Sequence, residues 1–118
     1  MQAFIDAYKD ALSKYADFSG RLSVGGYWRF FAVNLVIGVV LYVLGLAASI
    51  FLILYLLYSL ALIIPGLAAA VRRLHDTGKS GWYLLISFIP IVGFIVLIVF
   101  LASAGQTEPN EYGPPPTV

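Results

Sequence analysis

The chain has 118 residues, which is enough for one domain and no more. Hydrophobic residues make up 61% of it and charged residues only 11%, whereas an ordinary soluble domain has about 25% charged residues. A soluble protein of this size could not bury so much apolar surface, so the composition indicates a membrane protein. The absence of cysteine excludes disulfides and thiolate chemistry. The net charge of +1 gives no reason to expect nucleic acid as a partner.

Residues 2–17 have the period of an amphipathic helix. The apolar face consists of Phe4, Tyr8, Ala11, Leu12 and Tyr15, and the polar face of Asp6, Lys9, Asp10, Ser13 and Asp17. Because tyrosine favours the depth at which lipid meets water, the pattern predicts a helix that lies in the membrane interface. A short helix packed on the rest of the protein is the alternative.

Two membrane spans are expected after a glycine- and serine-rich break at residues 18–26. Residues 30–71 carry no charge and are about twice as long as the roughly 20 residues that cross a bilayer. We therefore expect a helical hairpin with spans at residues 28–48 and 50–71. Its turn falls between Gly45 and Ile50.

Residues 82–102 are uncharged and predict a third span. Pro90 lies near the middle, and a re-entrant hairpin would have two halves too short to cross, so we expect one kinked helix. The tail, residues 103–118, is polar and rich in proline, and is expected to be extended. The predicted fold is thus an all-α polytopic membrane protein with three transmembrane helices, an amphipathic N-terminal helix and an extended C-terminal tail.

The basic residues set the expected orientation. All seven lie before the first span or between the second and third, at Lys9, Lys14, Arg21, Arg29, Arg72, Arg73 and Lys79. The positive-inside rule then predicts a cytoplasmic N-terminus and a C-terminus on the opposite side.

The segment between the second and third spans, residues 72–81, holds the single histidine and three of the basic residues. A phosphate-binding P-loop ending at Gly78 would need a glycine where Arg73 stands, and a metal site would need more ligands than His75 and Asp76 provide. We expect no cofactor, no metal and no catalytic role here.

A structural role for this segment agrees better with its residues. If the second span continues past Val71, Asp76 can pair with Arg72 at i, i+4 or with Arg73 at i, i+3. Gly78 would end that helix, and Ser80 would cap the next one. Alternatively, Arg72, Arg73 and Lys79 bind anionic lipid headgroups.

Residues 72–82, the run Arg-Arg-Leu-His-Asp-Thr-Gly-Lys-Ser-Gly-Trp, resemble the hallmark of a bacterial inner-membrane family known as domain of unknown function 805. Further matching features are Gly20-Arg21 with Ser23, Tyr27-Trp28, Pro65, Ile89 to Gly93, and Gly105 with Asn110, Tyr112, Gly113 and Pro114. Val24 and Gly26 depart from the family, which usually has an arginine and a glutamate there. The resemblance implies a bacterial inner-membrane protein of unassigned activity.

These motifs define the candidate sites. The candidate structural or interaction site comprises Arg21, Trp28, Arg72, Arg73, His75, Asp76, Gly78, Lys79, Ser80, Gly81 and Trp82, and the candidate tail motif comprises Asn110, Tyr112, Gly113 and Pro114. We expect Arg21, which lacks a local carboxylate at Gly26, to reach Asp76 or the carbonyls near it. The alternative is that Arg21 extends to lipid phosphate.

The expected function is a non-enzymatic accessory or scaffold subunit of a membrane complex, which contacts membrane lipids and either other subunits or itself. The alternative is a small oligomeric transporter or channel-like protein. The uncharged spans argue against that alternative, because ionisable residues within a membrane usually mark a substrate path.

Overall fold

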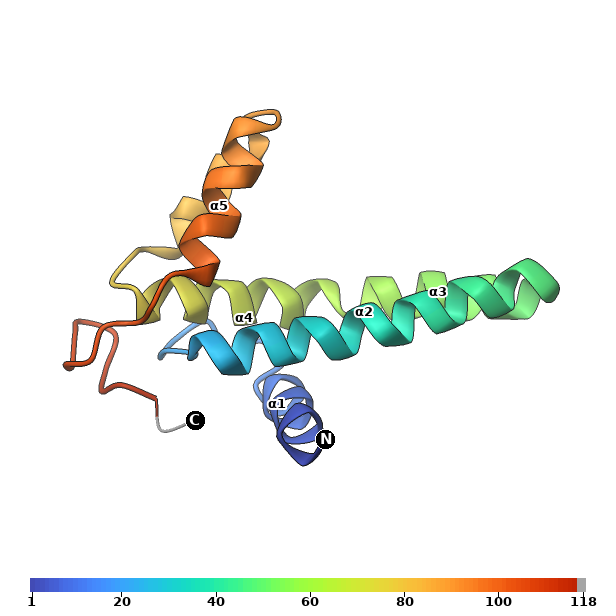
Figure 1. Ribbon diagram of the computed structural model, residues 1–118, viewed down its shortest axis with the longest axis horizontal. Helices are drawn as coiled ribbons and strands as arrows, with labels where there is room; N and C mark the ends of the chain where they lie inside the picture. Colours follow the sequence, from blue (N-terminus) through green and yellow to red (C-terminus); the bar gives the residue numbers. More distant parts are fainter. Residues whose placement is uncertain (117–118) are drawn as a thin grey trace.

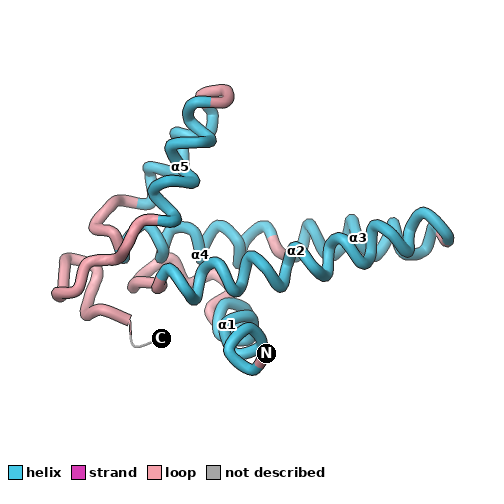
Figure 2. The backbone as a smooth tube through the Cα atoms, in the orientation of Figure 1, coloured by secondary structure: helices cyan, strands magenta, loops and turns pink. Residues whose placement is uncertain are grey.

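The structure, a computed structural model, describes residues 1–116 of the chain and is all-helical over them apart from loops (Figure 2). The elements in order are α1 (Gln2–Ser13), α2 (Val24–Ala47), α3 (Ser49–Ala61), α4 (Ile63–Asp76), the 3₁₀ helix η1 (Gly81–Phe88) and α5 (Val92–Ala102). Helix α2 runs out along the longest axis of the molecule, and α3 and α4 return beside it (Figure 1). Helix α5 and η1 form a second, shorter hairpin that diverges from the first (Figure 1).

Helix α2 is the helix expected for the first span, and it begins four residues before residue 28. The earlier start has a local cause, because the Ser23 hydroxyl accepts a hydrogen bond from the Gly26 amide at 3.0 Å and caps the helix. With 24 residues, α2 is about 36 Å long, more than the roughly 30 Å of bilayer hydrocarbon. Among residues 1–116 it is the one continuous helix that is long and apolar enough to cross a membrane.

The turn between α2 and α3 lies where it was predicted. Ala48, with φ −147° and ψ 123°, is the single extended residue between the two helices. Gly45 makes the close return possible, because a Cβ atom there would lie 2.5 Å from Leu52 Cδ2. The close return after a one-residue connection therefore needs a glycine at position 45.

The second predicted span is a bent pair of helices. Helices α3 and α4 meet at Leu62 with a bend of 41° and satisfy the length and hydropathy of a span only when taken together. Pro65 explains the break, because it has no N–H to donate to the carbonyl of Ala61, four residues earlier. The Tyr15 hydroxyl donates to that carbonyl instead, at 2.8 Å. A side chain from outside the hairpin therefore satisfies the group that proline leaves free.

The prediction of a single kinked helix over residues 82–102 is wrong. η1 ends at Phe88, and Val92 begins α5, which returns along η1. Pro90 and Val92 close the turn, in which the Val92 amide donates to the Pro90 carbonyl at 2.7 Å and Ile91 has φ 62°. Each arm is about 16 Å long, which is half of the hydrocarbon thickness. The prediction failed because it required a hydrophobic segment to cross, whereas a hairpin can enter and leave on the same side.

The predicted separation of the tail from the central segment is wrong for the same reason. The hairpin brings residue 103 back to the end of α4, and the Gln106 amide donates to the Asp76 carbonyl at 2.8 Å. The described part of the tail, residues 103–116, lies beside the central segment rather than at the far end of the molecule (Figure 1). Residues 117 and 118 of the predicted extended tail lie outside the described residues.

Helix α1 is shorter than the predicted residues 2–17 and packs across the base of the long hairpin (Figure 1). Ala11 is fully buried against Phe30 of α2 and Ala69 of α4. The Tyr8 ring packs on Phe30 with 5.9 Å between ring centroids. Part of the apolar face thus rests on the protein, while Phe4 and Tyr15 are exposed, and a location in the membrane interface stays a prediction.

Replacing Tyr15 with Phe tests how the bend in α3–α4 is stabilised. The substitution removes the donor to the Ala61 carbonyl, and we expect it to lower the free energy of unfolding by about 1 kcal/mol, since one hydrogen bond at the exposed bend is lost. Thermal unfolding in mild detergent measures the change. Tyr83→Phe is the matched control, because the Tyr83 hydroxyl makes no hydrogen bond to residues 1–116. Equal melting temperatures for the two variants would contradict this account of the bend.

Candidate structural and interaction site

The candidate site is centred on Asp76, the last residue of α4. Its carboxylate lies between two arginines: Arg21 Nε donates to Oδ1 at 3.0 Å and Arg73 Nη1 donates to Oδ2 at 2.8 Å. The three side chains are 5%, 1% and 0% exposed, so the cluster is shielded from solvent. The predicted reach of Arg21 to Asp76 is confirmed, and Arg21 does not extend to lipid. Of the two pairs that α4 allows, only the i, i+3 pair with Arg73 forms.

The same two guanidinium groups hold the tail. Arg21 Nη1 donates to the carbonyls of Glu108 and Gly113 at 2.9 and 3.1 Å, and Nη2 donates to the Gln106 carbonyl. Arg73 Nε donates to the Leu101 carbonyl at 2.9 Å, and Nη2 donates to the Ser103 carbonyl. Each arginine therefore neutralises Asp76 and fixes backbone that follows α5.

Gly105 lets the tail pass directly over the carboxylate. A Cβ atom at this position would overlap Asp76 Oδ2. The residue therefore has to be glycine for reasons of space, and its φ is not in the left-handed region. The close passage over Asp76 therefore explains why the tail has a glycine at position 105.

Two members of the tail motif, Asn110 and Tyr112, contact the central segment from the other side. The Asn110 amide donates to the His75 carbonyl at 3.0 Å, and the Tyr112 ring stacks on the His75 ring with 3.8 Å between centroids and 2° between planes. Gly113 turns the chain with φ 122°, and its amide and carbonyl pair with those of Asn110. The motif is thus the part of the tail that seats on His75 and Arg21.

His75 has a defined tautomer in this arrangement. Its Nδ1 lies 2.9 Å from the Gly20 carbonyl oxygen, which can only accept, so Nδ1 carries the proton. His75 is buried, with its ring between Gly20 and Tyr112. Its observed contacts orient the loop that carries Arg21.

Arg72 does not join the Asp76 cluster. It points to the carboxyl end of α1, where its Nη1 donates to the carbonyls of Lys14 and Asp17 at 3.3 and 2.5 Å. Its side chain is 1% exposed, and its Nε and Nη2 have no partner among residues 1–116. Hydrogen bonds from the Ser19 hydroxyl and amide, with Arg72 nearby, hold the pKa of Asp17 below its usual value.

The arginines outnumber the carboxylate, and helix ends supply part of the missing negative charge. Arg72 faces the C-terminal carbonyls of α1, and Arg73 faces the carbonyl of Leu101 in the last turn of α5. The carboxyl end of a helix carries a partial negative charge of about half a unit. Carbonyls at three helix ends, those of α1, α4 and α5, therefore contact the arginines.

The caps predicted for the central segment are confirmed. Gly78 has φ 79°, its amide donates to the His75 carbonyl at 3.0 Å, and the Lys79 amide donates to the Leu74 carbonyl at 2.9 Å. These two bonds form a Schellman motif, which ends α4. The Ser80 hydroxyl then accepts from the Trp82 amide at 3.2 Å and caps η1. The segment therefore ends α4 and redirects the chain into η1 within four residues, and Gly81 lies where a Cβ would crowd Val71 at 2.9 Å.

The three basic residues predicted to bind lipid headgroups do not form an exposed surface. Arg72 and Arg73 are buried, and Lys79 Nζ lies over the Phe100 ring, 4.8 Å from its centroid. Trp82 is 78% exposed and remains free to contact lipid. Binding of anionic headgroups stays a prediction, and the burial of two of its three cations argues against it.

Trp28, a member of the candidate site, contributes a hydrogen bond to it. Its indole N–H donates to the Leu101 carbonyl at 3.2 Å, the same oxygen that Arg73 Nε contacts. The last turn of α5 is thus bound to both α2 and α4. This shared acceptor fixes the base of one hairpin against the base of the other.

The sequence reasoning missed one group of polar residues. The Tyr58 hydroxyl donates to Asn34 Oδ1 at 2.5 Å and lies 2.9 Å from the Tyr8 hydroxyl, so α1, α2 and α3 are joined at this point. The signal was present, because Asn34 is the one asparagine in the uncharged residues 30–71 and a strongly polar amide within a span is costly unless it is bonded.

A comparison with known proteins finds a family that matches the part of the chain carrying these motifs. The family described as "Protein of unknown function (DUF805)" matches residues 15–114. The chain belongs to the DUF805 family. This match covers the Asp76 cluster, both hairpins and the tail motif, so the site lies entirely within the shared region.

Two relatives in Escherichia coli K12 extend the DUF805 match over nearly the whole chain. The chain is 41% identical to Inner membrane protein YhaI over 110 residues, which cover 92% of this chain and 93% of YhaI. It is 35% identical to Inner membrane protein YhaH over 120 residues, which cover 95% of this chain and 97% of YhaH. These names support an inner-membrane location for the chain. No solved structure matches it.

Replacing Asp76 with Ala should be strongly destabilising. The variant leaves Arg21 and Arg73 buried without their counterion, and breaking a buried pair in this way costs about 3–5 kcal/mol. A melting curve in mild detergent measures the loss. The exposed pair Lys14–Asp10, with 3.5 Å between Nζ and Oδ1, is the control, since Asp10→Ala should cost at most about 1 kcal/mol. Similar curves for both variants would place Asp76 in open water.

Replacing Gly105 with Ala tests the passage of the tail over Asp76. The added methyl group would overlap the carboxylate, so we expect the tail to detach and the melting temperature to fall. Limited proteolysis should cut the tail of this variant faster than that of the wild type. Gly38→Ala is the matched control, because its Cβ would meet only Tyr55 Cε2, at 3.7 Å. A Gly105→Ala tail as resistant as the control's would show that the tail does not cross the carboxylate.

Proposed function

We propose that the chain is a non-enzymatic accessory or scaffold subunit of an inner-membrane complex. The observation that carries the proposal is the shared contact at Leu101, whose carbonyl accepts from both Trp28 and Arg73. It joins the base of the η1–α5 hairpin to the bases of α2 and α4, and Asp76 with its two arginines closes the joint. A rigid base of this kind holds two apolar hairpins at a fixed relative orientation.

The exposed surface of the hairpins supports a role in assembly. Large apolar side chains stand out on both, for example Leu46, Leu57 and Leu60 on the long hairpin and Phe94 and Ile95 on the short one, each more than half exposed. In a bilayer these surfaces meet lipid tails or other helices. Because the polar groups at the base contact one another, the surface left for a partner is the apolar one.

The proposed topology differs from the one expected from three spans. The base holds the N-terminal loop, the central segment and the tail together, and all seven basic residues belong to helices or loops at that end or to α1. By the positive-inside rule the base is cytoplasmic, and the chain has both termini in the cytoplasm with a re-entrant η1–α5 hairpin.

The proposed topology can be tested with reporter fusions. Green fluorescent protein fused after Val118 should fluoresce, and alkaline phosphatase at the same site should be inactive, because the fusion site is cytoplasmic. Alkaline phosphatase inserted after Ala47, at the α2–α3 turn, is the internal control and should be active. An active phosphatase at both sites would require a third crossing and would refute the re-entrant hairpin.

Site-directed photo-cross-linking tests the scaffold role itself. A benzophenone amino acid at Phe94, or at Leu57, should give the same discrete protein adduct in the native host after purification in mild detergent. A probe at Thr107, in the exposed tail, is the control and should give a different pattern or none. Adducts to lipid alone from both hairpin positions would refute a subunit role. A homo-oligomer with a continuous polar pore would instead favour the transporter alternative.

A further inference from the structure

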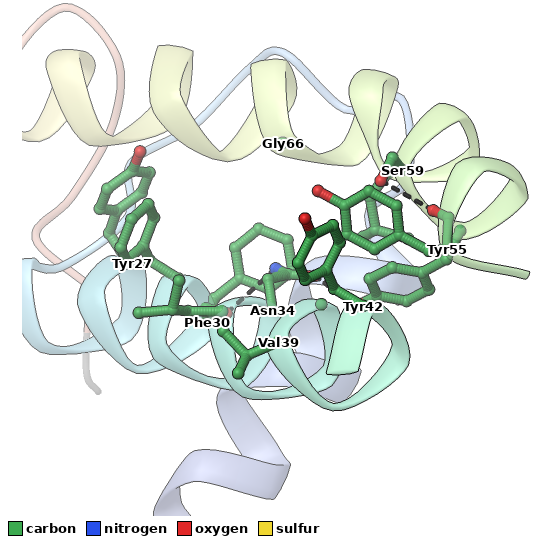
Figure 3. A pocket seen from close by; sticks show the side chains of 13 residues that line it. Tyr27, Phe30, Asn34, Val39, Tyr42, Tyr55, Ser59 and Gly66 are labelled. Atoms are coloured by element: carbon green, nitrogen blue, oxygen red, sulfur yellow. Dashed lines mark hydrogen bonds between the residues drawn. The ribbon is translucent and has the colours of Figure 1, made fainter. Parts of the chain in front are cut away.

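A groove with a cavity volume of about 600 Å³ lies between α2 and the α3–α4 pair (Figure 3). It is walled by aromatic side chains from both sides, among them Tyr27, Phe30 and Tyr42 of α2 and Tyr55 of α3. Figure 3 shows these rings in the space between the α2 ribbon and the α4 ribbon, where Gly66 lies across from them. The groove exists because α4 bends away from α2 after Leu62 and presents glycine rather than a large side chain.

The groove is open toward the surroundings of the helices. Phe31 and Tyr42, which line it, are 46% and 51% exposed. The rings of Tyr42 and Tyr55 meet edge to face, with 5.9 Å between centroids. A molecule dissolved in the bilayer could therefore enter sideways between aromatic walls without passing through water.

Polar groups inside this apolar groove are partly unused. Because the single hydroxyl proton of Tyr58 goes to Asn34 Oδ1, Tyr8 must donate to Tyr58. The Asn34 amide gives one of its two N–H groups to the Phe30 carbonyl at 3.0 Å. The other N–H, like the hydroxyls of Tyr27 and Tyr42, has no acceptor among residues 1–116. These donors point to a ligand that accepts hydrogen bonds.

The depth of these donors restricts the ligand class. Asn34 is ten residues into α2, about 15 Å along its axis from Val24. A phospholipid keeps its polar headgroup at the membrane surface, so its acyl chains would bring no acceptor to Asn34. The ligand has to carry acceptors on a part that resides in hydrocarbon, and the aromatic walls favour a planar ring.

We propose that this groove binds a lipid-soluble quinone. The ring lies between the aromatic walls, one ring carbonyl accepts from the free N–H of Asn34, and the apolar side chain extends along the groove toward lipid. The volume suits such a ring with the first part of its tail, since ligand pockets commonly measure about 300–1,000 Å³. This site is separate from the Asp76 cluster and does not depend on whether the chain is a subunit of a complex.

The test uses the full-length protein in phosphatidylglycerol nanodiscs, titrated with decylubiquinone while its intrinsic fluorescence is recorded. Wild type should show saturable quenching above that of empty discs. Asn34→Leu, which keeps the side-chain volume and removes the amide, should bind about tenfold more weakly, since one buried hydrogen bond is lost. Gly66→Phe should abolish binding, because a side chain at Gly66 meets no protein atom within 4 Å of its Cβ and would fill the groove.

Leu60→Phe is the matched control, because Leu60 is 65% exposed on α3 and does not line the groove. It should bind as wild type does, and circular dichroism should show the same helix content in every variant.

If Gly66→Phe does not fold, the binding of Asn34→Leu alone decides the test. Equal affinity of Asn34→Leu and wild type overturns the proposal. Competition by decylbenzene as strong as that by decylubiquinone also overturns it. Decylbenzene has the ring and tail but no carbonyl, so this result would indicate an apolar groove that binds lipid only. Gly66→Phe converting a dimer to a monomer, with no quinone effect, would assign the groove to a second copy.

Discussion

The architecture depends on one buried carboxylate. Asp76 ends α4, and its two oxygens accept from Arg21, which precedes α2, and from Arg73 of α4 itself. The two guanidinium groups share one carboxylate, and their mutual repulsion would not be offset if only apolar groups surrounded them. The remaining N–H groups are therefore met by carbonyls, and the carbonyls come from the tail and from the last turn of α5. Electrostatics thus requires the C-terminal segment to return to this place.

This requirement explains the short hairpin. A helix that crossed the bilayer after Trp82 would leave the tail on the far side, and Arg21 and Arg73 would lose most of their acceptors. Two arms of about half the hydrocarbon thickness bring Leu101 back beside Trp28 and Arg73 instead. Gly93 makes the return close, because a Cβ there would overlap the Ile86 carbonyl oxygen. The length of the two arms, the close turn at Gly93 and the Asp76 cluster are therefore all consistent with a hairpin that returns to the base.

In the long hairpin, polar groups at and near the bend are paired by side chains of the N-terminal segment. Pro65 breaks α3 from α4, and the resulting bend both frees the Ala61 carbonyl for Tyr15 and opens the groove along α2. Tyr8 lies within α1 and Tyr15 follows it, so the N-terminal segment provides hydroxyl groups to the hairpin at two points, Tyr58 and Ala61. Polar groups that would be costly in hydrocarbon are thereby paired by a segment that need not cross the membrane.

The sequence by itself determined the membrane class, helix α2, the α2–α3 turn and the caps at Gly78 and Ser80, and it left Arg21 with two possible partners, the Asp76 region and lipid phosphate. These follow from local composition, hydropathy and turn chemistry, or from charges that have to be matched. Only the tertiary structure decided whether residues 82–102 cross or return, because a hydrophobic run of that length satisfies either a kinked span or a hairpin. It also decided that Arg72 turns to α1 while Arg73 turns to Asp76, since both spacings are allowed on a helix and the choice depends on which face α1 covers.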